Sequence, residues 1–124
     1  MQNLLKTNTH WVILSHKTGR INTDTITKMP IGILKLTIYL PGAHSLKDKR
    51  RHIKPLVNQL RSKFNLSVAE IGGLDHWQTS YLLIAAASND AVHIEQTLTA
   101  VAQMAESTMR DGYITQQDWE IITE

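Results

Sequence analysis

The segment from Ser45 to Phe64 carries the pattern that most constrains the fold of this chain. On a helix at ~100° per residue, its apolar side chains fall within one arc about 100° wide. These side chains are Leu46, Ile53, Leu56, Val57, Leu60 and Phe64. A helix with one apolar face must bury that face against another element, so we expect residues 45–64 to form a helix packed on a sheet.

Strand patterns lie on both sides of this helix. Residues 33–40 alternate between apolar and polar positions, which is the period of a half-buried strand. Apolar segments at 66–71 and 77–88 predict two more strands, separated by the turn residues Gly72 and Gly73.

A second helix is predicted after Ser88, Asn89 and Asp90, which are typical capping residues. Its apolar stripe has helical spacing and consists of Ile94, Leu98, Val101, Ala105 and Met109. A last strand is expected at 113–122. The order β-α-β-β-α-β predicts an α+β ferredoxin-like sandwich, with a four-stranded, mostly antiparallel sheet and two helices on one face.

Residues 1–28 differ from the remainder of the chain. They are rich in Thr, Asn and Lys, and their only apolar island is 11–14. We expect a dispensable extension, either disordered or absent from the native product, although a strand joining the sheet is the alternative. Residues 29–124 are predicted to form the single folded domain.

Charge is strongly polarised along the sequence. Within 45–64, seven basic residues against one acidic residue give +6, whereas residues 65–124 hold one basic and nine acidic residues, or −8. On the helical projection the basic side chains form one flank beside the apolar arc: Lys47, Arg50, Arg51, Lys54 and Arg61. Such a flank is either a solvated helix face or an anion-binding surface, for which RNA phosphates are the expected ligand.

Two residues depart from the ideal helix pattern. Pro55 lacks an N–H group and crowds the carbonyl of Arg51, so we expect a kink or a restart of the helix there. Lys49 projects into the apolar arc, where its ammonium group must either extend past the edge of the core or indicate a rotated first turn.

Other chemistry is weakly represented. The chain has no cysteine, which excludes disulfides and thiolate metal sites, and no apolar run reaches the length of a membrane span. We therefore expect a cytoplasmic protein without membrane association. Phosphate-loop, dinucleotide and common hydrolase motifs are missing, so the chain is predicted to be non-enzymatic, with no cofactor and no metal.

Several polar and aromatic residues remain as secondary candidates. Glu70 is on the same side of its predicted strand as Leu66 and Val68, which are expected to face the core. It is therefore expected to form an ion pair with the basic helix flank. Glu70, Asp75 and His76 would be the groups of a metal site or an enzyme, a weaker hypothesis. Trp77 and Tyr81 share one strand face and would stack on RNA bases if that face were open.

Several pieces of this sequence resemble the YlxP-like family of small bacterial domains. They are 31–34 (IGIL), 45–51 (SLKDKRR), 64–70 (FNLSVAE), 75–78 (DHWQ) and 88–90 (SND). The resemblance covers about residues 29–124 and implies a ferredoxin-like fold. In many bacteria the family's gene lies beside those for translation initiation factor two and ribosome-binding factor A, which implies a role in ribosome maturation or initiation.

The leading hypothesis is a module that binds RNA or the ribosome through the basic helix flank. The alternative is a protein-interaction or dimerisation module that uses an edge strand or the open sheet face, with a second copy of the chain as its partner. Steep salt dependence of binding would favour the first, and salt-insensitive self-association the second.

Overall fold

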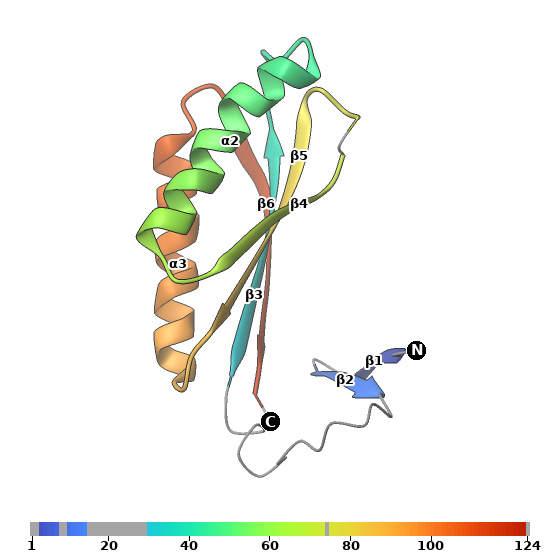
Figure 1. Ribbon diagram of the computed structural model, residues 1–124, viewed down its shortest axis with the longest axis vertical. Coiled ribbons are helices and arrows are strands. Elements are labelled where there is room, and N and C mark those ends of the chain that lie inside the picture. The colour runs from blue at the N-terminus through green and yellow to red at the C-terminus, as the bar shows by residue number, and fades with distance from the viewer. Residues whose placement is uncertain (1–2, 8–9, 15–29, 74, 124) are drawn as a thin grey trace.

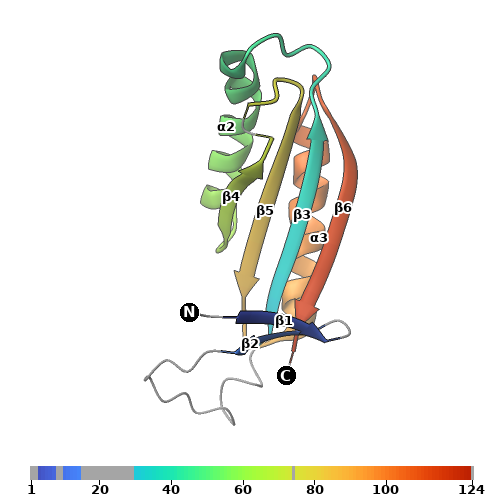
Figure 2. The same cartoon turned by 90° about the vertical axis from the view of Figure 1, so that its right-hand side faces the viewer.

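The folded unit is a four-stranded antiparallel sheet with two helices on one face (Figures 1 and 2). The computed structural model describes residues 3–7, 10–14, 30–73 and 75–123. The unit consists of β3 (Ile31–Tyr39), α2 (Leu46–Lys63), β4 (Ser67–Gly72), β5 (Thr79–Ala87), α3 (Ala91–Thr108) and β6 (Tyr113–Ile122). Its strands lie in the order β4-β5-β3-β6, which confirms the predicted ferredoxin-like arrangement.

The N-terminal segment contains a separate hairpin. β1 (Asn3–Thr7) pairs with β2 (His10–Leu14), and neither strand pairs with the four-stranded sheet within the described ranges. The alternative of an N-terminal strand joining that sheet is therefore wrong for these two strands. The predicted boundary between residues 28 and 29 lies outside the described residues.

The core lies between the sheet and the two helices. Leu34, Leu36 and Ile38 of β3 have no exposed surface, as the alternating pattern predicts. The apolar stripes of both helices face them. The stripe residues buried in this core are Ile53, Leu56 and Leu60 of α2, and Ile94, Leu98, Val101 and Ala105 of α3.

Helix α2 is continuous from Leu46 to Lys63. Its N-terminus is capped by Ser45, whose Oγ accepts a hydrogen bond of 3.0 Å from the backbone N–H of Asp48. Of the kink or restart predicted at Pro55, the restart is wrong, because the helix passes through this residue without interruption. Pro55 and Arg51 are both exposed, so the carbonyl that loses its donor lies on the solvent side of the helix.

Gly32 allows α3 to approach β3 closely. A Cβ atom added there would lie inside the van der Waals distance of Ile94 Cγ2 and 2.9 Å from Leu98 Cδ1. Ile94 and Leu98 are buried in the core, so neither can move aside without repacking.

The substitution Gly32→Ala should therefore lower the free energy of unfolding by about 1–3 kcal/mol through overpacking. Urea denaturation followed by circular dichroism would measure this change. Gly42→Ala is the matched control, since nothing lies within 4 Å of its added Cβ. Equal midpoints for the two variants would show that β3 and α3 are not in close contact at Gly32.

In the described part of the chain, no helix is long and apolar enough to cross a membrane.

Candidate functional site

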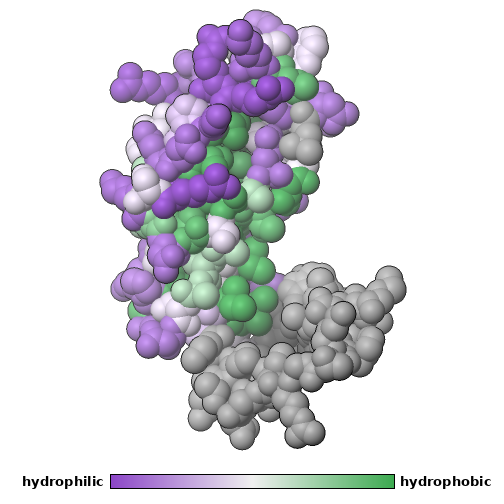
Figure 3. All heavy atoms as spheres, viewed as in Figure 1, coloured by the Kyte–Doolittle hydropathy of each residue, from purple (hydrophilic) through white to green (hydrophobic). Residues whose placement is uncertain are grey.

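A shallow groove of about 240 Å³ lies between α2 and β4. β4 is an edge strand of the sheet, and α2 packs against it. The groove is lined by Arg50, Ile53, Lys54, Val57, Asn58 and Arg61 of the helix and by Val68, Ala69 and Glu70 of the strand. Hydrophilic side chains also gather at the upper end of the molecule, where the first turns of α2 lie (Figure 3).

Three of the five predicted binding residues line this groove. Arg50, Lys54 and Arg61 lie along its helical wall, and all three are exposed. Lys47 and Arg51 are also exposed but are not among its lining residues. The basic flank predicted from the sequence thus divides into a groove set and an outer pair.

The outer residue Arg51 is already engaged within its own helix. Its Nη2 lies 2.6 Å from Asp48 Oδ1, three residues earlier, in an exposed ion pair. Such pairs contribute little to stability, yet they reduce the positive charge available to a ligand. Arg51 is therefore the weaker candidate among the predicted arginines.

Arg61 connects the two walls of the groove. Its Nη2 donates a hydrogen bond of 2.7 Å to the backbone carbonyl of Val68 on β4. The guanidinium thereby links α2 to the edge strand β4. The positive charge of Arg61 remains in the groove, held at a fixed position by this bond.

A buried ion pair lies beside the groove. Lys49 is only 2% exposed, and its Nζ lies 3.1 Å from Glu70 Oε2. The same ammonium group donates to the carbonyls of Gly73 at 2.6 Å and Thr79 at 3.3 Å, while Ser80 Oγ donates to Glu70 Oε2 at 2.7 Å. All three ammonium protons of Lys49 therefore have acceptors.

Glu70 does form an ion pair with the helix, as expected, but its partner is Lys49 of the apolar arc and not a residue of the basic flank. Of the two alternatives predicted for Lys49, extension past the edge of the core is wrong, because its charge is satisfied inside the protein. The pair joins the first turn of α2 to β4 and the following loop, and so fixes the spacing of the groove walls. It also neutralises the only carboxylate among the lining residues of the groove, which leaves the cations of Arg50, Lys54 and Arg61 uncompensated there.

The described residues contain no group of three or more His, Asp or Glu side chains that could hold a metal ion. Glu70 is occupied by Lys49 and Ser80. Asp75 and His76 are exposed in the connection between β4 and β5. The structure therefore does not assemble the metal or catalytic site that these three residues would form.

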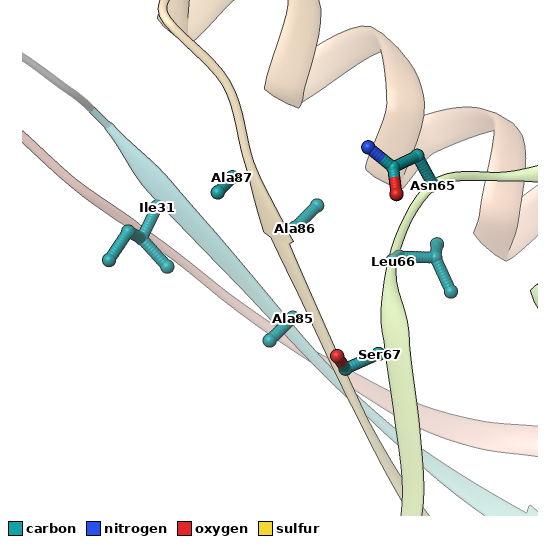
Figure 4. Close-up of a pocket in the computed structure, with 7 residues that line it drawn as sticks. All are labelled: Ile31, Asn65, Leu66, Ser67, Ala85, Ala86 and Ala87. Carbon is teal, nitrogen blue, oxygen red and sulfur yellow. The ribbon is translucent and has the colours of Figure 1, made fainter.

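A second hollow, of about 310 Å³, lies where β4 begins short of the end of β5 (Figure 4). Three residues with small side chains line it, Ala85, Ala86 and Ala87. Its other lining residues are Ile31, Asn65, Leu66 and Ser67. No ionisable side chain lines it, so it offers no group for acid–base chemistry. The alanine run in the sequence is the signal that would have predicted it.

Comparison with known proteins places the groove inside a recognised family region. The family described as "Protein of unknown function (DUF503)" matches residues 31–118. The uncharacterized protein YlxP of Bacillus subtilis (strain 168) is 34% identical over 90 residues, which is 72% of this chain and 98% of that protein. The groove and the Lys49–Glu70 pair both lie within the family match.

Among solved structures, the de novo designed protein Foldit4 has a TM-score of 0.48 and 10% sequence identity, over 77% of this chain and 98% of the designed one. At that TM-score the likeness adds nothing to the fold described above.

Proposed function

The chain belongs to the DUF503 family, whose function is unknown, and we propose that it is a non-enzymatic module that binds RNA through the α2–β4 groove. The observation that supports this proposal is the line of Arg50, Lys54 and Arg61 in one open groove. The ribosome is the expected source of the RNA, in maturation or translation initiation, following the gene neighbourhood that the YlxP-like resemblance implies.

The spacing of the groove cations suits a phosphate backbone. Arg50 and Arg61 are eleven residues apart on a continuous helix, which places them about 16 Å apart along its axis at ~1.5 Å per residue. Several successive phosphates of one nucleic-acid strand span that length. An open groove with exposed cations also matches a backbone ligand better than a small molecule, which needs an enclosed pocket.

The charge distribution would orient the protein on such a ligand. The cations line the β4 edge of the sheet, whereas β6 at the opposite edge carries Asp118 and Glu120. On α3, Glu95 and Glu106 are exposed. A polyanion is therefore attracted to one side of the molecule and repelled by the other.

The double variant Arg50→Glu/Lys54→Glu tests the proposal. It should reduce cosedimentation with ribosomes, or affinity for a ribosomal RNA fragment, by roughly tenfold or more, because two phosphate contacts become repulsions. Lys47→Glu/Arg51→Glu is the matched control, with the same charge change on the same helix but outside the groove. We expect this control to lose clearly less affinity.

Circular dichroism and urea denaturation of both variants would establish that each remains folded. Equal losses for the two double variants would contradict a role specific to the groove. Binding unchanged in both would show that the basic flank is only a solvated helix face.

A further inference from the structure

All three tyrosines of the chain lie at one end of the sheet face that the helices leave uncovered. Leu34, Leu36 and Ile38 face the helices, so the alternate positions of β3, including Tyr39, face the other way. Tyr39 is directly opposite Tyr113 of β6. Tyr81 of β5 is opposite Thr37 and therefore lies diagonally beside Tyr39 on the same face.

Two of these three tyrosines are exposed. Tyr39 is 41% exposed and Tyr113 is 64% exposed, while Tyr81 is partly buried. Figure 2 shows this face of the sheet towards the viewer, with α2 and α3 on its far side. We call Tyr39, Tyr81 and Tyr113 the tyrosine platform.

The platform has neutral and cationic neighbours. The ammonium of Lys35 lies 5.4 Å from the centroid of the Tyr81 ring, in a cation–π contact. The residues paired with the platform in the same rows of the sheet are Thr37, Gln116, Thr79 and Gly72. The carboxylates of β6 pair further along the sheet, Asp118 with Lys35 and Glu120 with Ile33. Asp118 also accepts hydrogen bonds of 3.2 Å from the Gln116 amide, so the negative charge of this face lies towards β6. A nucleic-acid strand meets the Lys35 cation and the threonine hydroxyl groups on the β4 side of the platform.

Only β4 separates Tyr81, the platform residue nearest to it, from the groove. Gly72 of β4 is paired with Tyr81, and the groove lies on the helix side of the same strand. At about 4.8 Å per strand, the platform residue on β3 lies roughly 10 Å from β4. A single nucleic-acid strand of a few nucleotides covers this distance.

Two glycines at the end of β4, Gly72 and Gly73, leave no side chain between this strand and the Tyr81 ring. A Cβ atom added to Gly72 would lie 3.3 Å from Tyr81 Cδ2, and one added to Gly73 would lie 3.2 Å from Cε2. The Tyr81 ring therefore rests against bare backbone at the end of β4. Gly73 also has a φ of 66°, which a residue with a side chain adopts at a cost.

We infer that the tyrosine platform stacks unpaired bases of the same RNA strand whose phosphates the groove binds. This inference rests on the proposed function and narrows its ligand to single-stranded RNA. Exposed aromatic rings on a sheet are suited to bases because every base has a face for stacking, whatever the sequence. Bases in a duplex are already stacked and cannot use the platform.

Binding of an oligouridine of about 12 nucleotides, compared with an RNA duplex of similar length, tests the inference. Tyr39→Leu/Tyr113→Leu keeps apolar side chains but removes the rings, and should weaken oligouridine binding by about tenfold or more. Tyr39→Phe/Tyr113→Phe is the matched control and should stay within about twofold of the parent, because phenylalanine still stacks. Duplex affinity and the salt dependence of binding should be unchanged in both.

The two proposals fail in distinguishable ways. If the leucine pair binds oligouridine as well as the parent, while Arg50→Glu/Lys54→Glu still weakens it, the platform inference is overturned and the groove stands. If the parent binds neither probe, both proposals are overturned.

If the leucine pair instead abolishes self-association and leaves RNA affinity unchanged, this face is a contact between copies and the inference fails. Should the pair unfold, Tyr113→Leu alone, at the most exposed ring, gives the same comparison.

Discussion

Replacing Lys49 by methionine should lower the free energy of unfolding by about 2–4 kcal/mol. This loss is somewhat below the usual cost of breaking a fully buried ion pair, because the Glu70 side chain is 22% exposed. The variant leaves the Glu70 carboxylate without its ammonium partner. It also leaves the carbonyls of Gly73 and Thr79 without the donor that they share. Urea denaturation would measure the loss.

The double variant Lys49→Met/Glu70→Gln separates the ion pair from simple packing. With the carboxylate replaced by an uncharged amide that still accepts from Ser80, the double variant should be less destabilised than the sum of the two single variants, by about 1 kcal/mol or more. Strictly additive effects would show that the ammonium and the carboxylate do not interact energetically.

Leu60→Ala should lower the free energy of unfolding by about 2–5 kcal/mol, because Leu60 has no exposed surface and the helix cannot collapse into the space it leaves. Val92→Ala on α3 is the control. Val92 is 60% exposed, so its truncation should change stability by less than about 0.5 kcal/mol. A near-neutral result for Leu60→Ala would mean that the apolar stripe of α2 does not face the core.

Much of the fold was predictable because its signals are local. The alternation of 33–40 fixes which face of β3 is buried, and the helical spacing of Ile94, Leu98 and Val101 fixes the phase of α3. Continuity of α2 through Pro55 was not predictable from the sequence. It depends on where Arg51 and Pro55 lie relative to solvent once the helix has docked.

The ion pair shows the limit of local patterns. The helical projection of residues 45–64 placed Lys49 in the apolar arc. The alternation of side chains along the predicted strand placed Glu70 among half-buried positions. Joining them requires the packing of α2 over the β4–β5 hairpin, which brings together residues 21 positions apart. Neither pattern alone carries that information.

The same limit applies to the candidate site. Helix phase put all five basic residues on one flank, but the position of β4 at the sheet edge decides that Arg50, Lys54 and Arg61 line the groove. Likewise, the alternation of side chains along β3 places Tyr39 on the uncovered face of the sheet. Only the register of β3 with β6 brings Tyr113 opposite it.

The salt dependence of RNA binding tests the central claim most directly. With three phosphate contacts from Arg50, Lys54 and Arg61, the logarithm of the association constant for single-stranded RNA should fall against the logarithm of salt concentration with a slope of about −2. In Arg50→Glu/Lys54→Glu the slope should be shallower by at least about one unit. A slope near zero for the parent chain, or the same slope in both proteins, would contradict binding of RNA phosphates in this groove.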